Sequence, residues 1–81
     1  MITVNVECYG VLRELCGAQI ELHLPQGADI ENLLQQLTEQ FPDMAPHLPG
    51  LACAQGDQLV PRNHVLKDAD RVALLPPVSG G

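Results

Sequence analysis

Residues 29–41 carry one amphipathic helical stripe, and the segments around it alternate as strands do. The apolar positions of the stripe recur at helical spacing, at Ile30, Leu33, Leu34, Leu37 and Phe41. Asp29 is a suitable N-cap, and Pro42 is expected to end the helix because proline lacks the backbone N–H that the next turn needs. The apolar face of this helix must be buried against another element of the fold.

Two strands are predicted before the helix. Residues 2–8 and 18–24 alternate between apolar and polar side chains, and a period of two is typical of a half-buried strand. The connection between them is short, which favours antiparallel pairing. Within it, residues 11–16 have the spacing of one or two helical turns, with Val11, Leu12 and Leu15 as the apolar positions and Gly17 just past the end.

After the helix, residues 42–50 contain three prolines and predict a turn or a short 3₁₀ segment. Short strands are expected near residues 51–54 and 58–60, followed by a turn at 68–70 and a last strand over 71–75. A long helix between two hairpins needs a mixed sheet in which the last strand returns beside the first. We therefore predict an α+β, β-grasp (ubiquitin-like) domain over residues 1–75, with one main helix, and an extended tail over residues 76–81.

The chain has 81 residues and a formal charge of −6. This length suits one domain, and the negative charge disfavours nucleic acid and anionic membrane surfaces as partners. A protein partner with a basic face is the natural complement, although the charge alone could also serve solubility. No apolar run is long enough to span a bilayer, and the N-terminus has no basic segment typical of a signal peptide. We expect a cytoplasmic protein.

The cysteines and histidines show no metal-ligand spacing. Three cysteines without a C-x-x-C pair suggest free, buried thiols in a reducing compartment, at Cys8, Cys16 and Cys53. The histidines are expected on the surface, at His23, His47 and His64. We therefore expect no metal and no cofactor of the chain's own.

The tail from residue 76 to residue 81 has the features of an arm that enters another protein. Pro76 and Pro77 lack backbone donors and project the chain stiffly outward, and Gly80 and Gly81 have no side chains to obstruct a narrow channel. The carboxylate of Gly81 is a poor electrophile until ATP converts it to an acyl-adenylate. Sulfur transfer onto the adenylate would give a thiocarboxylate. The sequence has no phosphate-binding glycine loop, so we expect a partner to use the ATP.

Two segments resemble the small subunit of molybdopterin synthase. Residues 11–17, VLRELCG, resemble that family's VRELxG segment, and residues 66–81 resemble its L-x-D-G-D-x-V-A-x-x-P-P-V-[ST]-G-G ending. The resemblance implies a ubiquitin-activating-like adenylyltransferase as one partner and the large synthase subunit as the other, in a heteromer. It also implies that sulfur passes to a pterin precursor, and that the chain is not catalytic alone.

Carried over residue by residue, the resemblance assigns the sulfur to Gly81 and threading to Gly80. It places Pro76, Pro77, Val78 and Ser79 in the partner's channel and adds Ala73 and Leu75 to the contact surface. Two positions depart from the family pattern. Ala69 stands where the family has glycine, and Leu74-Leu75 stands where aromatic residues are common.

Other functions fit the same fold and tail. A carrier for thiamine or cysteine synthesis would use the same carboxylate chemistry. A ubiquitin-like conjugation module would instead form isopeptide links to other proteins. An inert interaction domain would not depend on Gly81 at all.

Overall fold

The computed structural model describes residues 1–76. Its strands are β1 (Ile2–Cys8), β2 (Gln19–Leu24), β3 (Ala52–Gln55), β4 (Gln58–Val60) and β5 (Arg71–Leu75). Its helical segments are α1 (Val11–Cys16), α2 (Ile30–Gln40) and the 3₁₀ segment η1 (Pro42–Gly50). These bounds confirm the predicted elements to within a residue or two, because each element has its own hydrophobic period.

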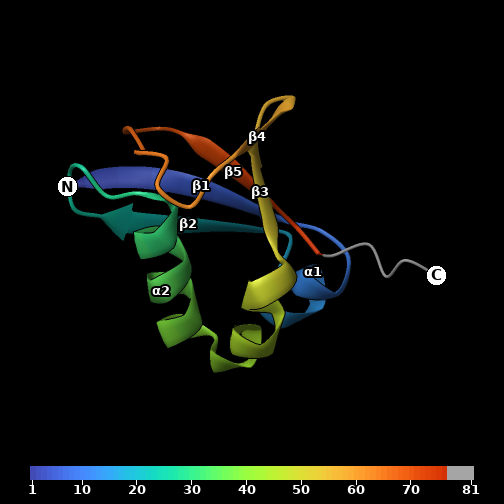
Figure 1. Ribbon diagram of the computed structural model, residues 1–81. Coiled ribbons are helices and arrows are strands. Elements are labelled where there is room, and N and C mark those ends of the chain that lie inside the picture. Colours follow the sequence, from blue (N-terminus) through green and yellow to red (C-terminus); the bar gives the residue numbers. More distant parts are fainter. Residues whose placement is uncertain (77–81) are drawn as a thin grey trace.

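The five strands form one mixed sheet in the order β2-β1-β5-β3-β4 (Figure 1). β1 pairs antiparallel with β2 and parallel with β5, while β3 pairs antiparallel with both β5 and β4. The last strand therefore lies at the centre of the sheet, beside the first. This topology confirms the predicted β-grasp, the ubiquitin-like fold.

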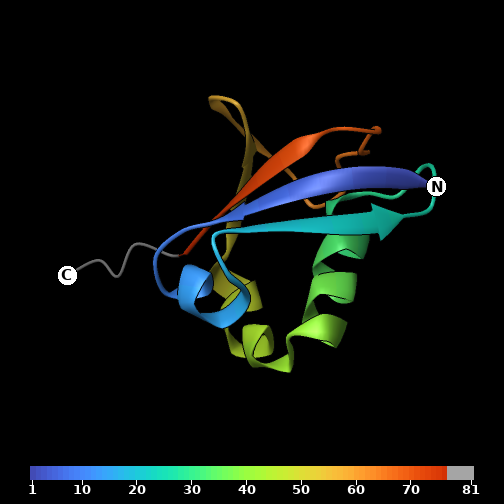
Figure 2. The same ribbon diagram turned by 180° about the vertical axis from the view of Figure 1, so that it is seen from behind.

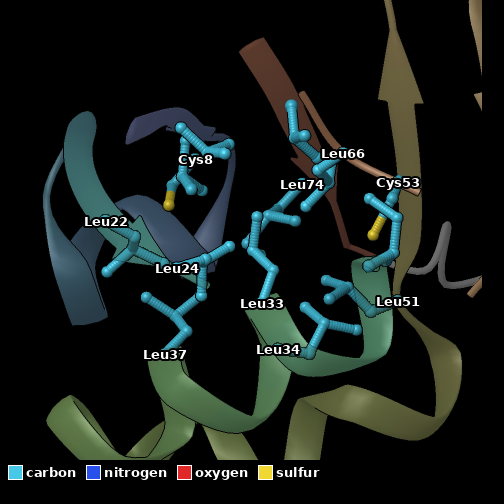
Figure 3. Close-up of a cluster of buried hydrophobic side chains, with 14 of the residues drawn as sticks. Cys8, Leu22, Leu24, Leu33, Leu34, Leu37, Leu51, Cys53, Leu66 and Leu74 are labelled. Carbon is cyan, nitrogen blue, oxygen red and sulfur yellow. The ribbon is translucent and has the colours of Figure 1, made fainter. Parts of the chain in front are cut away.

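All three helical segments lie on one face of the sheet (Figures 1 and 2). The stripe of α2 enters the core between the strands and η1, and Figure 3 shows its leucines pointing at side chains from β1, β2 and β5. No residue with a polar or charged side chain is buried in the part of the chain that the structure describes. The fold is therefore stabilised mainly by apolar burial. No helix within residues 1–76 is both long and apolar enough to cross a membrane.

A capping box begins α2. The Asp29 carboxylate accepts the backbone N–H of Asn32 at 2.9 Å, and the Asn32 side chain accepts the backbone N–H of Asp29 at 3.0 Å. The predicted N-cap is thus confirmed. The Asn32 side chain in turn satisfies the backbone N–H of Asp29, a donor that has no partner within the helix. Phe41 is the C-cap and only half-buried, but it still packs against the core, so the apolar stripe keeps its contact at the last position.

η1 is longer than the short segment expected from its three prolines, and it carries the fully buried Met44. The Arg62 guanidinium binds this segment. It donates to the carbonyl oxygens of Leu48, within η1, and of Leu51, just after η1, and it lies 3.7 Å from the Glu31 carboxylate. One cation therefore links the loop after β4 to η1 and to the first turn of α2.

The turn before β5 is bound to the start of β1. The Thr3 N–H donates to the Asp68 carboxylate at 2.8 Å, and the Ala69 N–H donates to the Thr3 carbonyl at 2.8 Å. Ala69 has φ 70°, the only positive φ at a non-glycine residue among those described. Alanine in this region costs about 1–2 kcal/mol because its Cβ crowds the following carbonyl. The backbone is therefore strained at the position where the family pattern has glycine.

We expect Ala69→Gly to raise the free energy of unfolding by about 1 kcal/mol, since relief of the strain exceeds the extra entropy of glycine in the unfolded chain. Ala18→Gly is the control, because Ala18 is also exposed but has no positive φ, and this change should lower stability by up to about 1 kcal/mol. Urea denaturation of both variants measures the difference. Equal losses in the two variants would contradict the assignment of strain to Ala69.

Candidate functional site: the end of strand β5

β5 ends at the same end of the sheet at which β1 passes into α1. Leu74 is opposite Cys8 on one side and opposite Cys53 on the other, and Leu75 is opposite Ala52. Because β1 and β5 run in the same direction, the chain leaves both strands at this end of the sheet, close to α1 (Figure 2). The fold therefore delivers residue 76 to the end of the molecule that carries α1.

Gly10 provides the surface against which Pro76 packs. A Cβ atom added to Gly10 would lie 2.9 Å from Cγ of Pro76, closer than real Cβ atoms approach a neighbour. Gly10 also has φ 61°, a conformation that other residues rarely adopt. Two independent constraints thus require glycine here. Sequence reasoning missed this role, although a glycine between a strand and a short helix was a signal for a special backbone conformation.

The side chains of β5 divide between the two faces of the sheet. Val72 and Leu74 are fully buried in the core, whereas Ala73 and Leu75 alternate with them and are half-buried. Ala73 and Leu75, both predicted contact residues, are therefore on the face that the helices leave uncovered, where a partner could reach them. Of the two leucines that replace the family's aromatic residues, only Leu75 has exposed surface.

The remaining predicted site residues are not among those that the structure describes. Pro77, Val78, Ser79, Gly80 and Gly81 are outside the described residues, so their roles stay predictions. The division of the chain at residue 75 also stays a prediction. Pro76 itself is described, is half-buried and lies against Gly10.

A shallow depression of about 260 Å³ lies at this end of the sheet. It is bounded by β1, the first half of α1 and the start of β2, through Glu7, Cys8, Tyr9, Arg13, Ala18 and Gln19. Tyr9 and Val11, on either side of Gly10, are 47% and 43% exposed. Val11 was grouped with the apolar helical positions, but it faces solvent because α1 turns only Leu12 and Cys16 fully inward.

The three cysteines are buried, as predicted. Burial raises the pKa of the Cys8 thiol to about 12, with a further contribution from its hydrogen bond to Cys16. Burial also raises the pKa of Cys53, against the opposing charge of Arg62. Cys8 and Cys53 are therefore protonated at neutral pH, and a protonated thiol is a poor nucleophile.

The histidines are separate from one another. His23 is exposed, as expected, and lies 3.6 Å from the Glu21 carboxylate. His47 and His64 are half-buried rather than fully exposed, and Nε2 of His64 is 2.6 Å from Oε1 of Gln55. Within residues 1–76 no three His, Cys, Asp or Glu side chains are placed to hold a metal ion.

A known family, known proteins and solved structures resemble this chain over most of its length. The model of the ThiS family matches residues 6–81. A molybdopterin synthase sulfur carrier subunit from Mycobacterium tuberculosis is 36% identical over 83 aligned residues, which cover all of both chains. The solved complex of subunits 1 and 2 of the molybdopterin-converting factor from Helicobacter pylori contains a chain 27% identical to this one, with a TM-score of 0.67, covering 99% of this chain and 100% of that chain.

A putative molybdopterin-converting factor subunit 1 from Pyrococcus furiosus has a TM-score of 0.86 at 23% identity. The superposition covers 96% of this chain and 100% of that chain. At this level of identity the likeness supports the fold alone.

A double-mutant cycle tests the contact between Gly10 and Pro76. Gly10→Ala should cost about 2 kcal/mol or more, from the positive φ and from the clash with Pro76 Cγ. In a Pro76→Ala background the clash is absent, so the cost should fall by about 1 kcal/mol while the φ penalty remains.

Chemical denaturation of the four proteins gives this coupling energy. Gly56→Ala is the matched control, because Gly56 has φ 60° but nothing within 4 Å of an added Cβ. Its cost should be the same with Pro76 or Ala at position 76. A coupling energy near zero for Gly10 and Pro76 would show that the contact does not position the chain.

Proposed function

The chain belongs to the ThiS family, and on that premise we propose that it is a sulfur carrier for molybdopterin synthesis, with sulfur held on the carboxyl group of Gly81. The observation that carries this proposal is the 36% identity, over the full length of both chains, to a molybdopterin synthase sulfur carrier subunit. The fold supports it, because the parallel pairing of β1 and β5 brings residue 76 to an exposed end of the sheet.

The chemistry takes place at the carboxyl group and requires a second protein. A carboxylate repels nucleophiles and has no good leaving group. An adenylyltransferase of the ubiquitin-activating type would join it to AMP, with release of pyrophosphate from ATP. A hydrosulfide equivalent would then displace AMP and leave a thiocarboxylate on Gly81. The protonated state of Cys8 and Cys53 fits this division of roles, because neither is poised to act as the sulfur nucleophile.

The sulfur would pass to the pterin precursor held by the large subunit of molybdopterin synthase, in the cytoplasm. The related Helicobacter pylori protein was solved in complex with subunit 2 of its molybdopterin-converting factor, which supports a partner of that kind. We assign Pro76 to Ser79 to the partner's channel, Gly80 to its narrowest part, and Ala73 and Leu75 to the contact around its mouth. Small side chains and missing backbone donors suit such a channel because nothing in it must be moved aside or left unpaired.

The chain isolated from cells that make the cofactor should be partly heavier by the mass difference between sulfur and oxygen, with the change on the peptide containing Gly81. Intact mass spectrometry and peptide mapping measure this. A variant extended by one tryptophan after position 81 is the control and should carry no sulfur. Sulfur-free Gly81, or adducts through isopeptide links to other proteins' lysines, would instead favour a conjugation module.

Complementation separates the synthetic pathways. The chain should restore cofactor synthesis to a strain that lacks its own molybdopterin sulfur carrier, and the extended variant should not. Restoration of thiamine or cysteine synthesis alone would assign the carrier to another pathway.

Leu75→Asp should weaken binding to the large subunit by about tenfold to a hundredfold, because it places a charge in the apolar contact next to the channel. Val65→Asp is the matched control. Val65 is 55% exposed and apolar, but it pairs with Asp29 at the N-terminal end of α2, away from residue 76. Calorimetric titration measures both affinities, and equal weakening by the two changes would remove Leu75 from the contact.

A further inference from the structure

Two cysteine side chains touch within the core beside the proposed site. The Sγ atoms of Cys8, at the end of β1, and Cys16, at the end of α1, are 3.0 Å apart. The Cys16 thiol also lies 3.2 Å from the Leu12 carbonyl oxygen, to which it donates. The proposed sulfur-carrier function uses neither thiol.

The third cysteine, Cys53, is too far from Cys8 to form a disulfide with it. Cys8 and Cys53 are both opposite Leu74, on the two sides of β5. Two strand spacings separate their backbones by about 9–10 Å, and a disulfide needs Cα atoms within about 7 Å. Figure 3 shows the Cys8 and Cys53 side chains on opposite sides of Leu74.

A small molecule has a route to the pair. Cys8 is one of the residues that line the depression of about 260 Å³, although its own exposure is only 2%. α1 has only six residues, and helices this short open readily because few hydrogen bonds hold them. Hydrogen peroxide is small enough to enter the depression and reach a thiol when α1 opens.

We propose that Cys8 and Cys16 form an oxidisable pair, and that their disulfide ties α1 to the end of β1 at the base of the segment that carries the sulfur. The bridge would close a loop of residues 8–16, which contains Gly10, the residue on which Pro76 packs. The sulfur atoms must approach by about 1 Å to reach a bond of about 2.05 Å, a shift within the reach of side-chain rotation.

The oxidation balances with one molecule of hydrogen peroxide. Opening of α1 exposes the pair to water and relieves the burial that keeps Cys8 protonated, so that its thiol can ionise. The thiolate sulfur then attacks one oxygen of hydrogen peroxide, the O–O bond breaks, and the leaving hydroxide takes up the proton that the thiol released and forms water. The sulfenic acid so formed is then attacked by the second sulfur, the S–S bond forms, and the S–O bond breaks with release of a second water. The two sulfurs lose two electrons in total, and both thiol protons end in water.

Mass spectrometry tests the pairing. The reduced, full-length chain is treated with hydrogen peroxide near one equivalent, then alkylated, digested and mapped. We expect a product lighter by two hydrogen atoms, with the bridge between the peptides of Cys8 and Cys16 and with Cys53 alkylated. Cys53→Ala should form the same product, whereas Cys16→Ala, which keeps Cys8 and Cys53, should not. Mapping of the unaltered chain decides the question even where a variant folds poorly.

Hydrogen exchange tests the consequence. The backbone N–H groups of Leu12 and Arg13 bond to the carbonyls of Tyr9 and Gly10 at 3.2 and 3.1 Å, inside the closed loop. Their exchange should slow about tenfold or more after oxidation, because the bridge restricts the opening of α1. Oxidation to sulfinic acids without a bridge, a bridge that includes Cys53, or a bridge that leaves these exchange rates unchanged would each overturn the proposal.

Discussion

The parallel ladder between β1 and β5 is the interaction on which the rest of the structure depends. It joins the first strand to the last at the middle of the sheet, through pairs such as Val6 with Val72 and Cys8 with Leu74. Because the two strands run in the same direction, the chain after β5 leaves beside α1. An antiparallel β5 would send residue 76 to the opposite end of the molecule, where the turn at residues 67–70 now lies.

The helices that pack on one face of the sheet stabilise this ladder. The inward residues of β1 and β5, Val4, Val6, Val72 and Leu74, are completely buried in the same cluster as the stripe of α2. Apolar burial of this kind has no direction of its own, so the direction of β5 comes from its backbone hydrogen bonds and from the turn bound to Thr3. Stability and placement of the site are therefore supplied by the same residues, and a core substitution would be expected to affect both.

In a small carrier of this type, the folded domain and the reactive group are separate parts of the chain. The domain buries its cysteines in protonated or hydrogen-bonded form, while the reactive group proposed for transfer lies on a segment without side-chain bulk. This arrangement keeps a sulfur-handling protein from reacting through its own thiols under reducing conditions. The contact between Cys8 and Cys16 marks the one place in the described chain where two thiols could respond to oxidants together.

Local sequence determined the elements of this protein: the alternation of residues 2–8 and 18–24, the stripe on α2 and the prolines after it set the bounds of strands and helices. It also determined the tail motif, because Gly80 and Gly81 need no neighbour to be recognised. Only the tertiary structure decided that Gly10 must be glycine to admit Pro76, that Cys8 meets Cys16 rather than Cys53, and that Arg62 fastens η1. The physical reason is range: hydrophobic periodicity is a property of near neighbours, whereas contacts between residues 10 and 76 depend on how strands from opposite ends of the chain pair.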